Sequence, residues 1–161
     1  MFEVGYYEPM TIAARDVANW FLGRIDRPAG DSISNLKLQK LVYYAQAYYL
    51  AHHGKPLFDE ELQAWTHGPV APSVYREFKR YGYDSIPAPT GEAKFDAQIE
   101  SFLTSILNVF GGYTGKALEL MTHDETPWLE TRKGLAPEAS SEKSISKDIM
   151  RDFYRRVLTS E

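Results

Sequence analysis

The chain has 161 residues, of which 43% are hydrophobic and 14% aromatic, so it is long and apolar enough for one domain with a sizeable core. A formal net charge of −4 and the absence of cysteine exclude a basic field over the whole chain, disulfides and thiolate zinc sites. No apolar run approaches the ~18 residues of a membrane span, and residues 1–10 lack the basic and apolar regions of a signal peptide, so a cytoplasmic protein is expected.

The first predicted helix runs from about Thr11, a possible N-cap, to Ile25. Its apolar residues, from Ala14 through Phe21, recur at the three- and four-residue spacing of one helix face. Residues 27–31, RPAGD, end the helix, because proline and glycine interrupt the pattern.

The second predicted helix covers about residues 35–53, and Gly54 follows its last turn. Apolar residues line two nearly opposite sides of it, so we expect other elements to pack on both sides of a central helix. Between these sides runs a narrow polar seam that carries Lys37, Lys40 and Tyr44.

Residues 62–66, LQAWT, alternate apolar and polar side chains and predict a short strand, in which Trp65 is most simply a core aromatic. After it, Gly68 permits a backbone turn that other residues resist. Pro69 cannot donate a hydrogen bond to a ladder, so the strand is expected to stop there. Pro72 suits the first position of a helix. The stretch therefore predicts a strand, a sharp turn and a helix start.

Four further helices are predicted from the helical spacing of apolar residues. They cover about residues 73–81, 95–110, 114–121 and 146–157. After Met121 comes THDETPW, residues 122–128, and then a polar loop is expected up to about Ser144. The sequence thus predicts a mainly α protein: a compact bundle of five to six helices around the central helix 35–53, with a small two- or three-stranded β element near 62–66.

His67, in the turn, has two interpretations. A histidine here can hold the turn by hydrogen bonds, or it can act as a general base or metal ligand. A metal site would need partners, which His123 with Asp124 or Glu125 could supply across the fold. The sequence has no HxxxH or HxH spacing, so the structural role is favoured, and a metal-dependent hydrolase using His67 and His123 is the alternative hypothesis.

Other chemical signals are weak. The sequence has no G-x-S-x-G elbow, no P-loop and no G-x-G-x-x-G, so neither an enzyme activity nor a cofactor is expected. Arg76, Lys79 and Arg80 form a basic edge on the third helix, which is either a solvated face or a contact for an acidic partner. The net charge argues against nucleic acid binding, although this edge leaves DNA autorepression open.

Several motifs together resemble the Panacea-domain family, the SocA-like antitoxins that are often labelled phage-associated proteins. They are LKLQKL at 36–41, PLF at 56–58, AWTHGPV at 64–70 and VY at 74–75 followed by a short basic helix, and then Thr122, His123, Pro127 and Trp128 of a T-H-x-x-x-P-W block. The resemblance covers about residues 12–158. Residues 1–10 are not part of the pattern and are expected to be an N-terminal extension of a single domain, residues 11–161.

The resemblance implies an antitoxin that neutralises its cognate toxin by direct protein contact. A further role that it implies is that of an adaptor, which delivers the toxin to a Clp-type ATP-dependent protease. It also implies a mostly helical domain with a small sheet. Neutralisation by contact needs a rigid face with aromatic and basic anchors. The residues expected on this face are Lys37, Lys40, Tyr44, Trp65, His67, Tyr75, Arg76, Lys79 and Arg80.

Overall fold

The computed structural model describes residues 12–160, so the expected N-cap Thr11 and the expected extension, residues 1–10, lie outside the described residues. The α-helices are α1 (Ala14–Leu22), α2 (Asn35–His53), α3 (Pro72–Phe78), α4 (Ala97–Phe110), α5 (Gly115–His123), α6 (Thr126–Thr131) and α7 (Lys147–Thr159). Two 3₁₀ helices, η1 (Arg27–Ala29) and η2 (Lys79–Tyr81), and two strands, β1 (Gln63–Trp65) and β2 (Gly68–Val70), complete the order. The prediction of a mainly helical protein with a small β element is confirmed.

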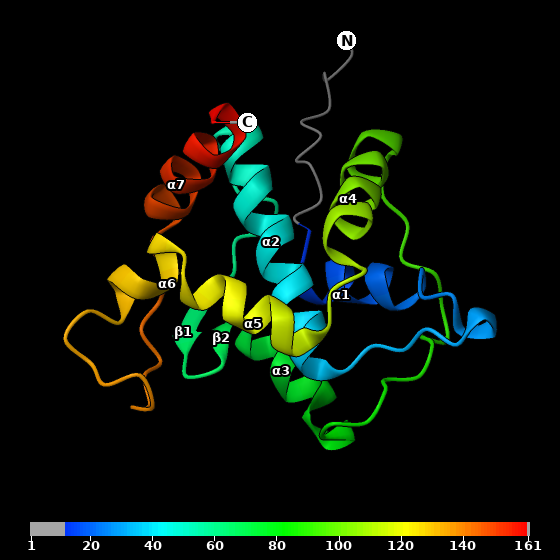
Figure 1. The fold of residues 1–161 in the computed structure, drawn as a ribbon. Coiled ribbons are helices and arrows are strands. Elements are labelled where there is room, and N and C mark those ends of the chain that lie inside the picture. Colours follow the sequence, from blue (N-terminus) through cyan, green and yellow to red (C-terminus); the bar gives the residue numbers. More distant parts are fainter. Residues whose placement is uncertain (1–11, 161) are drawn as a thin grey trace, which may run out of the picture.

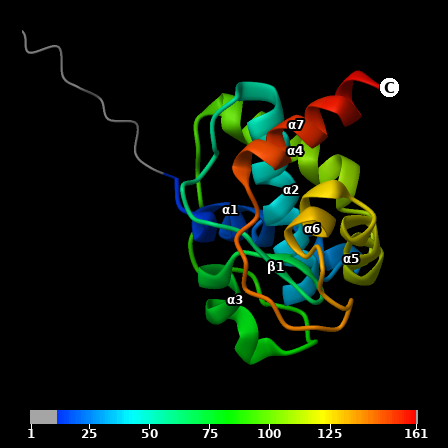
Figure 2. The same cartoon turned by 90° about the vertical axis from the view of Figure 1, so that its left-hand side faces the viewer.

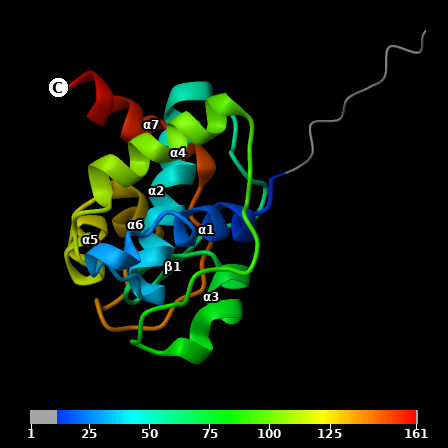
Figure 3. The ribbon, with the colours of Figure 1, turned by 90° about the vertical axis from the view of Figure 1, so that its right-hand side faces the viewer.

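Helix α2 runs through the middle of the molecule, and α4 and α7 lie on opposite sides of its upper half (Figure 1). Around its lower half it contacts α1, α3, α5 and β2. The views from the two sides place α7 in front of α2 in one and α4 in front of it in the other (Figures 2 and 3). The prediction of a central helix packed on two sides is therefore confirmed.

Local chemistry sets the ends of α2 where the sequence predicts them. The hydroxyl of Ser34 accepts a hydrogen bond from the backbone N–H of Lys37 over 3.3 Å, which satisfies one of the free donors of the first turn. At the other end Gly54 has φ of +72°, the left-handed conformation that ends many helices. The side chains of Asp96, Thr114 and Ser146 cap α4, α5 and α7 in the same way as Ser34 caps α2.

Helix α6 was not predicted: it covers the end of THDETPW and the start of the predicted loop, so the described residues hold seven α-helices rather than five or six. Pro127 occupies its first turn, where the missing N–H of proline breaks no helical hydrogen bond. Trp128 is 5% exposed and packs into the core. A helix of six residues is too short to show a hydrophobic period, and its stability depends on tertiary packing of its buried residues, Pro127 and Trp128.

The strands form an antiparallel hairpin with a two-residue turn, Thr66 and His67. Pro69 does not end the strand as predicted, because it lies in the middle of β2, opposite Ala64. Hydrogen-bonded and non-hydrogen-bonded pairs alternate in such a ladder. The N–H of Ala64 points away from β2 and donates to the carbonyl of Lys143 over 2.9 Å, so the missing N–H of Pro69 costs the ladder no bond.

The segment just before α7 runs along the outer edge of β1 (Figure 2). An isolated bridge pairs Gln63 with Ser144, and the N–H of Ile145 donates to the carbonyl of Leu62 over 2.7 Å. This segment covers the edge of β1 and leaves few of its backbone groups unpaired. In residues 12–160 no helix combines the length and the apolar character needed to cross a membrane.

Candidate functional site

A groove of about 850 Å³ opens above the β-hairpin, and we call it the hairpin groove. Its walls come from the start of α2, the hairpin, α3 with η2, α5 and the loop before α7. Five of the sequence-predicted face residues line it: Lys40, Trp65, His67, Tyr75 and Lys79. It is also lined by residues outside the predicted face, among them Asn35, Gln39, Tyr83, Lys116, Glu119 and Glu142.

Lys40 forms part of the groove floor and is fully buried, so it does not lie on an exposed polar seam. Its ammonium donates to the carbonyl of Pro69 over 3.0 Å. Burial lowers the pKa of this amine to about 7, although the nearby charge of Glu119 opposes the shift. The lysine therefore ties α2 to β2 and is shielded from a partner by the strand that it holds.

Gly68 makes this approach possible. A Cβ atom at position 68 would lie 2.6 Å from Cε of Lys40 and 2.9 Å from the hydroxyl oxygen of Thr122, closer than atoms can pack. The residue also has φ of +105°, a conformation that side chains other than that of glycine rarely adopt. Glycine is required here both by the backbone and by the space that Lys40 fills.

Glu119, on α5, is the electrostatic centre of the groove floor. Its Oε2 atom lies 3.2 Å from Nδ1 of His67, 3.3 Å from Nζ of Lys116 and 4.0 Å from Nε2 of His123. Burial opposes ionisation of Glu119, but the hydrogen bonds from His67 and Lys116 outweigh it and hold the pKa of this carboxyl below its ordinary value. A carboxylate only accepts hydrogen bonds, so Nδ1 of His67 carries the proton in this contact.

A buried network of side-chain amides fixes the wall of the groove where β2 meets α3. The amide oxygen of Gln39 accepts from the backbone N–H of Ala71 over 2.9 Å. Its Nε2 donates to the side-chain oxygen of Asn35 over 2.9 Å. Because both contacts are buried, the start of α3 is held against α2 and the shape of the groove is set by the fold.

The T-H-x-x-x-P-W block braces the hairpin from the far side. The ring of His123 stacks on Trp128 with centroids 4.0 Å apart, and the indole N–H of Trp128 donates to the carbonyl of Trp65 over 2.8 Å. Arg132 lies over the same indole and donates to the carbonyl of Ala64 over 2.8 Å. Further bonds from Arg132 reach the carbonyls of Ala136, Pro137 and Ala139. Burial lowers the pKa of His123, which favours a neutral ring in this stack.

The two histidines of the metal hypothesis do approach each other, but through Glu119 rather than through Asp124 or Glu125. Asp124 is exposed, and Glu125 accepts hydrogen bonds from Tyr44 and Tyr154. Within residues 12–160, no group of three or more histidine, aspartate or glutamate side chains is arranged to hold a metal ion. The geometry shows His67 and His123 in structural contacts of the hairpin.

Four predicted face residues lie outside the groove. Lys37 donates to the carbonyl of Gly111 over 2.6 Å and holds the end of α4. Tyr44 is fully buried and stacks on Phe110 with centroids 4.2 Å apart. Tyr44 is therefore a core residue, and its hydroxyl, like that of Tyr154, bonds to Glu125 inside the protein. Arg76 and Arg80 are exposed on the outer side of α3 and η2.

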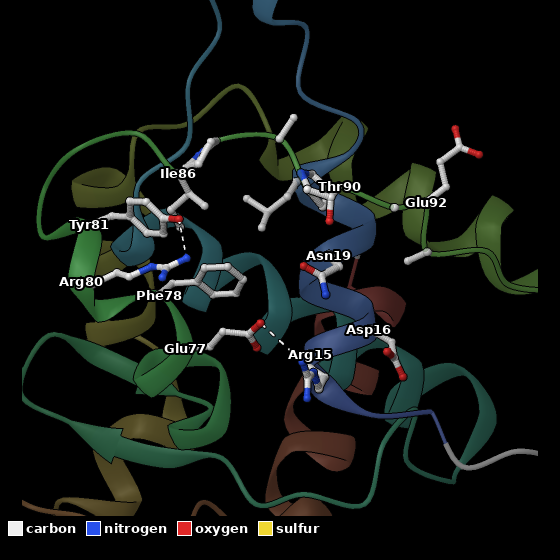
Figure 4. A pocket seen from close by; sticks show the side chains of 16 residues that line it. Arg15, Asp16, Asn19, Glu77, Phe78, Arg80, Tyr81, Ile86, Thr90 and Glu92 are labelled. Carbon is white, nitrogen blue, oxygen red and sulfur yellow. Dashed lines mark hydrogen bonds and ion pairs between the residues drawn. The ribbon is translucent and has the colours of Figure 1, made fainter.

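A second, smaller cavity of about 570 Å³ lies on the other side of α3 and η2, between them, α1 and the loop of residues 86–93 (Figure 4). Arg15 and Glu77 face each other across it at 3.5 Å, and Arg80 donates to the hydroxyl of Tyr81 over 2.8 Å. The two cavities share no lining residue, so α3 and η2 form a ridge between two separate surfaces.

Comparison with known proteins agrees with the resemblance seen in the motifs. The family described as "Antitoxin SocA-like, Panacea domain" matches residues 38–129, which is more than half of the chain. "Antitoxin SocA" of Caulobacter vibrioides (strain NA1000 / CB15N) is 44% identical over 78 residues, which are 47% of this chain and 39% of that protein. The match thus spans well under two thirds of the relative's length. No solved structure matches the chain.

Proposed function

Because the chain belongs to the SocA-like, Panacea-domain antitoxin family, we propose that it is an antitoxin that neutralises a protein toxin by direct binding at the hairpin groove. The observation that carries this proposal is the position of the groove. Lys40, Trp65, Tyr75 and Glu119, which line the groove, all lie within the residues that match the family.

Rigid walls support the role of the groove in binding. The hairpin is held by Lys40 from inside and by Trp128 and Arg132 from outside. A preformed surface loses little conformational entropy when a partner docks, so more of the contact energy appears as affinity. On its walls Trp65 and Tyr75 pack edge to face with centroids 4.8 Å apart, and aromatic anchors of this kind dominate many protein interfaces.

Binding also explains the titratable groups better than catalysis does. The charged atoms of the floor engage one another around Glu119, and Lys40 is engaged by a backbone carbonyl. None of these contacts presents a nucleophile beside a free base. We infer that the protein acts by contact and performs no reaction of its own.

Co-expression tests the proposal. The product of the adjacent open reading frame should stop growth when expressed alone, and this chain should restore growth and co-purify with it. Tyr75→Ala and Lys79→Glu should weaken protection, because both side chains line the groove. Lys133→Glu is a matched control, since Lys133 is exposed and lies outside the groove. A harmless neighbour, or protection lost equally in the control, would refute the proposal.

Delivery of the toxin to a Clp-type ATP-dependent protease is a second proposal, favoured by the separate cavity beside α1. An adaptor must contact two proteins at once. Because the two cavities share no lining residue, occupation of the hairpin groove leaves the other surface open. Purified toxin should then be degraded in the presence of ATP, the protease and this chain, and remain intact without the chain. If the chain protects cells but the toxin is never degraded in this assay, occlusion is the mode of neutralisation.

A further inference from the structure

The hairpin groove is basic on its accessible side, in a chain whose net charge is −4. The groove is lined by Lys40, Lys79, Lys116, His67, Glu119 and Glu142. Glu119 is 4% exposed and is already paired, so it presents little negative charge to the groove. Lys79 and Lys116 are exposed, and Glu142 is the one exposed acid among the residues that line the groove. The exposed side of the groove therefore carries more basic than acidic side chains, which favours an anionic partner.

The donors of this accessible side have spare capacity. Lys116 uses one contact, 3.3 Å to Glu119, while an ammonium carries three donors. Lys79 makes no side-chain hydrogen bond or ion pair in the described part of the chain. Both ammonium groups can therefore donate a hydrogen bond to a carboxylate of a partner without breaking a bond that holds the fold.

Apolar surface lies directly beside these cations. Trp65, Tyr75, Leu36 and Val70 line the same groove, and Tyr83 stands fully exposed at its edge. Carboxylates alone would bind weakly to exposed lysines because water screens the attraction. An apolar side chain buried against the Trp65–Tyr75 pair would supply the remaining affinity.

We propose that the hairpin groove binds an acidic, extended segment of the partner protein, with an apolar side chain against Trp65 and Tyr75 and a neighbouring carboxylate facing Lys79 and Lys116. This inference rests on the proposed function, since it names the chemistry that the toxin presents. A nucleic acid would bring one phosphate per nucleotide, so the acidic net charge of the chain disfavours it more than a segment with few carboxylates.

Fluorescence anisotropy with the whole chain tests this directly. The probe is a fluorescein-labelled, capped peptide that alternates aspartate with phenylalanine and leucine. Its counterpart carries asparagine in place of each aspartate, and a labelled single-stranded oligonucleotide represents nucleic acid. The acidic peptide should bind about fivefold more tightly than the asparagine peptide, which corresponds to the upper range for an exposed ion pair. Lys79→Glu should weaken it about fivefold, with Lys133→Glu unchanged.

Three results would overturn the inference: equal binding of the two peptides, no binding of the acidic peptide at millimolar concentration, or tighter binding of the oligonucleotide. Loss of binding in Tyr75→Ala would further place the apolar side chain against the aromatic pair, and unaltered binding there would contradict that part. The peptide assay needs no toxin, so its failure beside successful protection in co-expression would reject only the acidic segment. Peptide binding without protection would reject the antitoxin role instead.

Discussion

The ammonium of Lys40 lies 3.0 Å from the carbonyl oxygen of Pro69 and joins the central helix to the second strand inside the protein. Both groups would be costly to bury alone, because an unpaired amine or carbonyl loses its bonds to water. Their pairing fixes the position of the hairpin along the axis of α2. The shape of the groove above the hairpin therefore depends on a contact that no partner touches.

Replacement of Gly68 by alanine should lower the free energy of unfolding by about 2–4 kcal/mol, because strain at a positive φ adds to a steric clash. The added Cβ would lie 2.6 Å from Cε of Lys40. Gly134→Ala is the matched control, since Gly134 also has a positive φ, +87°, but no atom lies within 4 Å of the added carbon. Urea unfolding measures both. An equal decrease in the free energy of unfolding in the two variants would mean that the Lys40 side chain moves away from the added carbon at little energetic cost.

Lys40→Met should reveal the lowered pKa of the buried amine as a pH-dependent stability difference. The pKa in the folded protein is about 7, against an ordinary value of 10.5. Between these values the unfolded chain holds a proton that the folded protein has released, so the stability of the folded state rises with pH. Methionine has a similar length and does not titrate.

The measurement is the free energy of unfolding of the wild type minus that of Lys40→Met, from pH 5.5 to pH 9. We expect a constant difference below about pH 7 and a rise above it, with a slope of at most about 1.4 kcal/mol per pH unit. A difference that stays flat to pH 9 would show that the amine keeps its proton when buried.

Much of the helical architecture could be predicted from the sequence. Helix α2 begins after Ser34 and ends before Gly54, because a capping hydroxyl and a left-handed glycine are local signals that tertiary contacts did not override. The hairpin was predicted only in part. In the sequence alone, a proline after a strand pattern indicates that the strand ends. Only the pairing register shows that Pro69 lies at a position of β2 where no N–H is needed.

The candidate site shows where sequence reasoning stops. Lys37, Lys40 and Tyr44 share one stripe of α2, and a polar stripe indicates a solvated face when the neighbours are unknown. In the structure α5 and β2 cover Lys40, while Phe110 covers Tyr44. Glu119 gave no signal at all, since it meets His67 across 52 residues of chain. Which helix covers a polar stripe depends on long-range packing, which periodicity does not contain.

Tyr154→Phe should destabilise the protein by about 1–3 kcal/mol, because it breaks one buried and one partly buried hydrogen bond. The hydroxyl of Tyr154 lies 2.9 Å from that of Tyr43 and donates to Glu125 over 3.0 Å. Tyr113→Phe is the control, since Tyr113 is 46% exposed. Thermal and urea unfolding measure the change, and a loss no larger than that of the control would contradict a structural role for the cluster.

Arg132→Lys should loosen the hairpin more than it destabilises the whole protein. The guanidinium of Arg132 is buried over Trp128 and donates to the carbonyl of Ala64 and to carbonyls of the following loop, whereas an ammonium cannot span these positions in one plane. We expect the amide of Ala64, which bonds to Lys143, to exchange with solvent at least about tenfold faster, as loss of one or two hydrogen bonds implies. Amides in the middle of α2 should change less. Arg156→Lys, at an exposed position on α7, is the matched control. Uniform acceleration across the helix and the hairpin would show that Arg132 supports the whole fold and not the groove wall in particular.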